Sequence, residues 1–126
     1  MTVVLDASAL LAVIFGEPGG SVVERSLSDA FMLTVNVSEA VSKLLDRGFD
    51  LENARRAVTR FPLMFVPFDQ ELAVLAASLR PRTRHLGFSF ADRACLALAE
   101  REGRPALTAD RVWSQVDLGI TVELIR

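Results

Sequence analysis

Four carboxylates stand where the chemistry of this sequence is concentrated, and in chain order they are Asp6, Glu39, Asp92 and Asp110. The first and last directly follow apolar runs at residues 2–5 and 105–108, and the other two lie near the starts of segments with helical spacing. Carboxylates that meet repel one another, and oxygen-preferring Mg²⁺ or Mn²⁺ relieves that repulsion. Such a cation lowers the pKa of a water molecule and neutralises phosphate charge, which is the chemistry of phosphodiester hydrolysis.

The elements that would position these acids alternate along the chain. Apolar, β-branched runs predict strands at residues 2–5, 31–34, 64–66, 105–108 and 121–124. Helical spacing and capping residues predict helices at residues 7–15, 21–28, 36–47, 51–60, 70–79, 89–102 and 111–116, with a basic loop at residues 80–87. The alternation predicts an α/β fold, a three-layer α/β/α sandwich around a central, mostly parallel sheet of four to five strands.

This architecture predicts that the four acids meet. In an open parallel sheet, ligands bind outside the carboxyl ends of the strands, where Asp6 and Asp110 are expected. Glu39 and Asp92 are expected in the first turns of helices that begin at the same edge. The sequence therefore predicts a cluster of four carboxylates at one sheet edge.

Each acid also has a purely structural interpretation. The first and last can be N-caps of the helices that follow them. Asp92 can close a capping box with Ser89, and Glu39 can pair with Lys43 four residues further along a helix. Taken singly these roles are the more common ones, and only convergence of all four acids favours a site.

Composition limits the class of protein. The chain has 126 residues, 51% of them hydrophobic, which predicts a single folded domain over residues 1–126 and excludes intrinsic disorder. The longest uncharged stretch, residues 7–16, is half the length that a spanning helix needs, and no signal peptide is apparent. One histidine and one cysteine exclude a zinc site built on those residues, so we expect a cytoplasmic protein without a disulfide.

Four segments carry a resemblance to a known family, at residues 4–10 (VLDASAL), 36–44 (NVSEAVSKL), 86–99 and 107–113 (LTADRVW). In order and spacing they resemble the acidic motifs of PIN-domain proteins. In length and motifs the chain resembles the VapC toxins of type II toxin–antitoxin pairs.

The resemblance implies a Mg²⁺- or Mn²⁺-dependent endoribonuclease that hydrolyses RNA phosphodiester bonds with a metal-activated water. It implies a cognate VapB-type antitoxin, a homodimer and a hetero-oligomer with that antitoxin. The implied catalytic residues and metal ligands are Asp6, Glu39, Asp92 and Asp110, supported by hydrogen bonds from Ser8 and Thr108.

Basic residues near these motifs are candidate RNA contacts, although a solvated surface is an equal alternative for the loop. The net charge is −2, so the chain as a whole is not a basic nucleic-acid binder. The candidates are Arg82 and Arg84 in the basic loop, and Arg93 and Arg111, which directly follow site acids.

Other functions stay open beside this one. The chain can be a PIN nuclease without an antitoxin, or a catalytically silent PIN-fold binding module. A phosphatase with Asp6 as nucleophile is a weaker alternative, because such sites carry a second aspartate two positions on, where this chain has Ser8.

Overall fold

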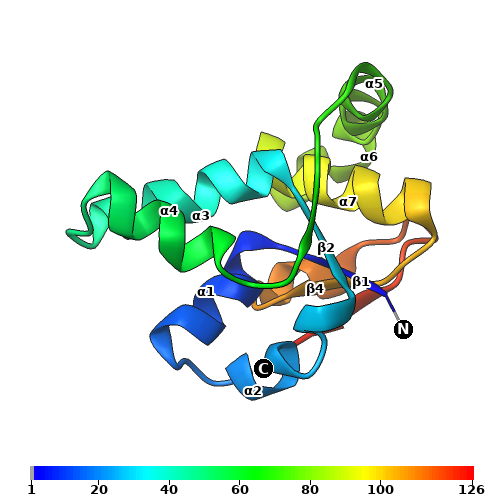
Figure 1. The fold of residues 1–126 in the computed structure, drawn as a ribbon. Coiled ribbons are helices and arrows are strands. Elements are labelled where there is room, and N and C mark those ends of the chain that lie inside the picture. Colours follow the sequence, from blue (N-terminus) through cyan, green and yellow to red (C-terminus); the bar gives the residue numbers. More distant parts are fainter. Residues whose placement is uncertain (1) are drawn as a thin grey trace.

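A five-stranded parallel sheet forms the centre of the computed structural model, which describes residues 2–126 (Figure 1). The strands lie in the order β3-β2-β1-β4-β5. They are β1 (Val3–Leu5), β2 (Ala30–Leu33), β3 (Met64–Val66), β4 (Ala106–Thr108) and β5 (Val122–Leu124). The helices are α1 (Ala7–Phe15), α2 (Gly20–Glu24), α3 (Thr34–Asp46), α4 (Leu51–Thr59), α5 (Gln70–Ser78), α6 (Arg80–Thr83) and α7 (Phe90–Glu102), with 3₁₀ turns at Leu27–Asp29, Arg84–Leu86 and Arg111–Gln115.

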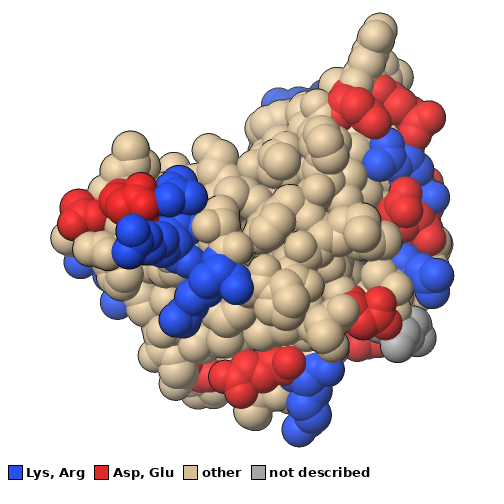
Figure 2. Space-filling model, in the orientation of Figure 1, with Lys and Arg blue, Asp and Glu red and all other residues tan. Residues whose placement is uncertain are grey.

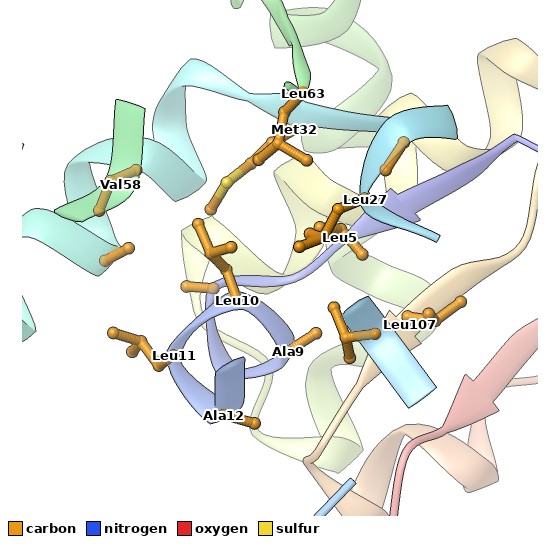
Figure 3. Packing of buried hydrophobic residues seen from close by; sticks show 14 of the residues in the cluster. Leu5, Ala9, Leu10, Leu11, Ala12, Leu27, Met32, Val58, Leu63 and Leu107 are labelled. Carbon is orange, nitrogen blue, oxygen red and sulfur yellow. The ribbon is translucent and has the colours of Figure 1, made fainter. Parts of the chain in front are cut away.

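Two hydrophobic clusters cover the two faces of the sheet. Side chains alternate along β1, so Val3 and Leu5 join the cluster under α1 and α2, while Val4 joins the cluster under α5 and α7. Figure 1 shows α1 and α2 on one side of the sheet and α5 to α7 on the other. Figure 3 shows the first cluster, in which the Met32 side chain reaches toward Leu10 of α1. The predicted three-layer sandwich is confirmed, and every strand pair is parallel.

Local sequence signals predict correctly where most helices begin and end. Asp50 and Asp69 cap α4 and α5 as expected, accepting backbone N–H groups at 2.8 and 2.9 Å. Gly16 ends α1 in the left-handed region, with a φ of 65°, which a glycine adopts without steric cost. The observed bounds differ from the expected ones by one or two residues for most elements.

Two expectations are wrong. The helix expected at residues 21–28 stops at Glu24, and a 3₁₀ turn follows that buries Leu27. The basic segment at residues 80–87 is not a loop, because it forms α6 and a 3₁₀ turn. Pro81 lies in the first turn of α6, where its missing N–H costs nothing and its φ angle suits a helix.

Charge is unevenly distributed over the surface. Figure 2 shows an uncharged central face, crossed by the segment around β3, with acidic and basic side chains on its flanks. The segment at residues 61–68 contains no charged residue. Across residues 2–126, no helix combines the length and the apolar character that crossing a membrane requires.

Candidate active site

Asp6 and Asp110 lie beyond the ends of neighbouring strands. β1 and β4 are parallel and hydrogen-bonded, with Leu5 opposite Leu107. The backbone N–H of Asp6 extends this pairing by donating to the Leu107 carbonyl at 3.0 Å. The residues that follow the two strands are therefore brought to one edge of the sheet, as the topology predicts.

Two hydroxyl groups hold the Asp6 carboxylate, which is only 5% exposed. Ser8 Oγ and Thr108 Oγ1 lie 2.7 and 2.9 Å from Asp6 Oδ2. Each hydroxyl also accepts a backbone N–H, from Ala109 and Asp110 respectively. A hydroxyl has one proton to donate and lone pairs with which to accept, so each can donate to Asp6 while it accepts a backbone N–H. These contacts are the ones that the predicted supporting roles of Ser8 and Thr108 require.

Glu39 reaches the site from α3. The helix begins at Thr34, two residues earlier than expected, so Glu39 lies in its second turn and not in its first. One carboxylate oxygen, Oε1, is buried without a hydrogen-bond partner. Asn36, one turn earlier and fully buried, donates to the Ala91 carbonyl at 3.2 Å and so ties α3 to the first turn of α7. Asn36 was not among the residues predicted from sequence, although an amide among the apolar positions of this helix is a signal for it.

Asp92 and Asp110 have the helix-capping roles that the sequence offered as alternatives to a site. Asp92 Oδ2 accepts the Ser89 N–H at 2.9 Å, and Ser89 Oγ accepts the Asp92 N–H, so the capping box is formed. Asp110 Oδ1 caps the following 3₁₀ turn through the Val112 N–H at 3.1 Å. Each of these cap bonds uses one oxygen of the carboxylate, and the second oxygen takes no part in it. Asp6, in contrast, makes no side-chain cap bond at the start of α1.

All four acids line one cavity of about 220 Å³, the acid cavity. Its other lining residues are Ser8, Lys43, Ala109 and Arg126. Within residues 2–126, no three Asp, Glu, His or Cys side chains already stand in an arrangement that would coordinate one ion. Asp92 and Asp110 each direct one carboxylate oxygen to a backbone N–H group.

The electrostatics of the acid cavity favour added positive charge. Burial raises the pKa of Asp6, against the hydrogen bonds from Ser8 and Thr108, and the nearby Asp92 charge raises it further. Burial and then the charge of Asp6 raise the pKa of Glu39, although Lys43 opposes the shift. Two carboxyl groups with raised pKa values, those of Asp6 and Glu39, together with the unpartnered Glu39 Oε1, fit a hard divalent cation.

The arginines expected to contact RNA do not line the acid cavity. Arg82 and Arg84 are exposed on α6 and the turn after it. Arg93 donates to the Ala76 carbonyl at 3.2 Å and joins α7 to α5, and Arg111 donates to the carbonyl of Arg126 at 2.9 Å. The cations that do line it are Lys43, considered from sequence only as a partner of Glu39, and Arg126, which was missed.

The fold is shared with toxin–antitoxin proteins of known structure. VapBC from Salmonella typhimurium bound to DNA has a TM-score of 0.75 at 14% identity, covering 100% of this chain and 99% of that chain. VapBC2 from Rickettsia felis, bound to a promoter DNA fragment, has a TM-score of 0.74 at 13% identity, covering 98% of each chain. Mycobacterium tuberculosis VapC20, a sarcin–ricin loop cleaving toxin, has a TM-score of 0.72 at 16% identity, covering 94% of this chain and 98% of that chain.

These identities are low, so the likeness to solved structures establishes the fold alone. No curated protein matches the sequence significantly. The family model described as PIN domain matches residues 3–118, which is most of the chain. The sheet order, the acid cavity and this match agree, and the chain belongs to the PIN domain family.

Proposed function

We propose that this PIN domain is a divalent-metal-dependent endoribonuclease and the toxin of a VapBC-type pair. The observation that carries the proposal is the acid cavity, in which four carboxylates from four separate segments line one space. Surface acids would have no reason to converge in this way, and burying Asp6 among them raises its pKa.

The residues of the acid cavity have different roles in the proposed reaction. The four acids would hold Mg²⁺ or Mn²⁺, which when bound lowers the pKa of water and neutralises phosphate charge. Ser8 and Thr108 orient Asp6 by donating to Oδ2. Glu39 lines the cavity with its Oε1 free of any hydrogen-bond partner, so this oxygen is placed to accept a proton from water there. Lys43 and Arg126 offer positive charge to the phosphate at the rim of the cavity.

The toxin role is supported by the solved structures with this fold, several of which are complexes of a toxin with its antitoxin. We propose a VapB-type antitoxin as partner and a homodimer as the toxin's own assembly. An antitoxin that placed an arginine or lysine among the four carboxylates would supply the positive charge that the cavity favours.

A cleavage assay on total RNA tests the nuclease. We expect wild-type protein to cut RNA with Mn²⁺ and to stop when EDTA is added. Asp6→Asn should abolish cutting while its circular dichroism spectrum stays that of the parent. Asp50→Asn is the matched control, because Asp50 is an exposed N-cap on α4 that does not line the acid cavity. Cutting by Asp6→Asn at the parental rate would overturn the assignment.

Absence of cleavage by the wild type would favour the silent binding module. A growth assay then separates the toxin from a nuclease without an antitoxin. Expression of the chain should arrest growth, and co-expression of a VapB-type antitoxin that binds the chain should restore it. Growth that continues at full metal-dependent activity would contradict the toxin role.

A further inference from the structure

A second cavity, of about 350 Å³, adjoins the acid cavity. The two share Ser8, Lys43 and Arg126, so they meet at these residues. The second cavity then extends along α1 and α3 to Phe15 and Arg47. We call it the basic cavity, because three cations and two acids line it whereas the acid cavity has four acids and two cations.

One face of α3 links the two cavities. Glu39 lines only the acid cavity, Lys43 lines both, and Arg47 lines only the basic cavity. Residues four apart lie on the same helix face and rise by about 6 Å from one to the next. Charge along this face therefore changes from negative at Glu39 to positive at Lys43 and at Arg47, the residue that follows α3, over a rise of about 12 Å.

The third cation is held at the junction of the cavities. Arg126 Nη1 donates to the Pro18 carbonyl at 2.9 Å and lies 3.6 Å from Glu17 Oε1. Its neighbour Ile125 packs against Gly19, where a Cβ atom would collide with the Ile125 backbone. The loop between α1 and α2 thus fixes the guanidinium at the rim of both cavities.

The far wall of the basic cavity offers a flat surface. The Arg47 guanidinium carbon lies 4.2 Å from the centroid of the Phe15 ring, so the cation rests on an aromatic face. Bases of single-stranded nucleic acid stack on aromatic rings and on guanidinium planes, whichever base is present. A phosphate site and a stacking surface are the two parts that hold one nucleotide.

We propose that the basic cavity binds the nucleotide of single-stranded RNA next to the scissile phosphate. Lys43 and Arg126 contact the phosphate that joins the two cavities, and Phe15 with Arg47 stacks the base. These cations offset the repulsion that the acid cavity exerts on any polyanion. The proposal rests on the proposed nuclease function and moves the RNA contact away from the arginines of α6.

Binding without cleavage tests this proposal. The affinity of the full chain for a labelled single-stranded RNA is measured by fluorescence anisotropy in EDTA at several salt concentrations. We expect Lys43→Gln and Arg126→Gln each to weaken binding and to reduce the salt slope by about one, because both contact the phosphate, and Arg47→Gln to weaken binding by removing part of the stacking surface. Phe15→Leu should weaken binding at least about fivefold without changing that slope, because it removes stacking and no charge.

Arg60→Gln is the matched control, since Arg60 is also exposed and also rests on a phenylalanine, 4.8 Å from the Phe61 ring centroid, outside both cavities. It should change affinity less than twofold. Parental affinity in Arg47→Gln and Phe15→Leu, or equal losses in Arg60→Gln, would overturn the proposal. So would a loss seen only in Arg82→Gln and Arg84→Gln.

The two proposals fail separately. If the wild type binds RNA through the basic cavity but never cuts it, the nuclease function fails and the RNA site stands. If the wild type cuts RNA and the basic-cavity variants have parental KM and affinity, the RNA site fails and the nuclease function stands.

Discussion

Two groups of acids in this molecule have opposite surroundings. At the outer ends of α5 and α7, Arg101 joins three acids, with N···O distances of 3.0 Å to Asp69 and 3.2 Å to both Glu71 and Glu102. In the acid cavity, Asp6 receives two hydroxyl groups and no guanidinium. The pKa of Asp69 is lowered, first by the Leu72 N–H and then by Arg101, whereas burial raises the pKa of Asp6.

The difference shows what each group of acids does for the fold. The acids around Arg101 are exposed to water and paired with its guanidinium. The four acids of the cavity carry more negative charge than Lys43 and Arg126, the two cations that line it, can balance, and the rest of the fold holds them there. A protein keeps such an arrangement for a ligand, because stability alone would favour the first kind of environment.

Exchanging one carboxylate for an amide in each group should give the largest contrast. Asp92→Asn should lower the rate of RNA cleavage by at least about 100-fold, because even residues beside metal ligands are worth 10- to 100-fold. Asp69→Asn should change the rate less than twofold. Both substitutions keep an oxygen that can accept the capping N–H, so helix stability is matched. Equal rates for the two variants would mean that Asp92 serves only in the capping box.

Divalent cations should stabilise the cavity and not the surface group. At 100 times its Kd, Mn²⁺ should raise the free energy of unfolding by about 2.7 kcal/mol. We expect this gain in the wild type and in Asp69→Asn, and little of it in Asp6→Asn. Thermal denaturation with and without Mn²⁺ measures it, and a full gain in Asp6→Asn would place the ion elsewhere.

Stability without metal should respond to pH in opposite directions in the two groups. A carboxyl group with a raised pKa binds protons more readily when folded, so Asp6 and Glu39 stabilise the fold as pH falls from neutral toward about 4 and lose that contribution as pH rises. Asp69 has a lowered pKa, so its contribution is present above about pH 4 and is lost below it.

Urea denaturation between pH 3 and pH 8 separates these effects. Asp6→Asn should remove part of the stability gained between neutral pH and about pH 4, and Asp69→Asn should remove part of the loss below that range. An unchanged pH profile in Asp6→Asn would show that its burial has no electrostatic cost.

Sequence patterns predict the frame of this protein because local chemistry determines it. Asp50, Asp69 and Ser89 cap helices where the sequence places them. The meeting of Asp6 and Asp110 follows from strand pairing, which a parallel α/β fold largely dictates. The convergence of the four acids at one sheet edge is therefore predictable from sequence. Their role as metal ligands stays a prediction.

What sequence patterns miss depends on packing between distant segments. Ile125 packs on Gly19, and this contact holds the neighbouring Arg126 beside the cavities. No local sequence pattern predicts a contact between these two distant segments. Asn36 matters through its bond to Ala91 on another helix. The arginines of α6 are dense in sequence, yet density along a chain says nothing about which face of the fold they occupy.

The smallest expected effect is that of breaking the surface group itself. Arg101→Gln should lower the free energy of unfolding by only about 0.5–1 kcal/mol, because its partners are 33–70% exposed and water competes for each charge. The loss should shrink in 1 M NaCl, and Arg25→Gln, outside the group, should show none. A loss above 2 kcal/mol that salt does not reduce would mean that these exposed acids depend on their cation as strongly as we expect the acids of the cavity to depend on a metal.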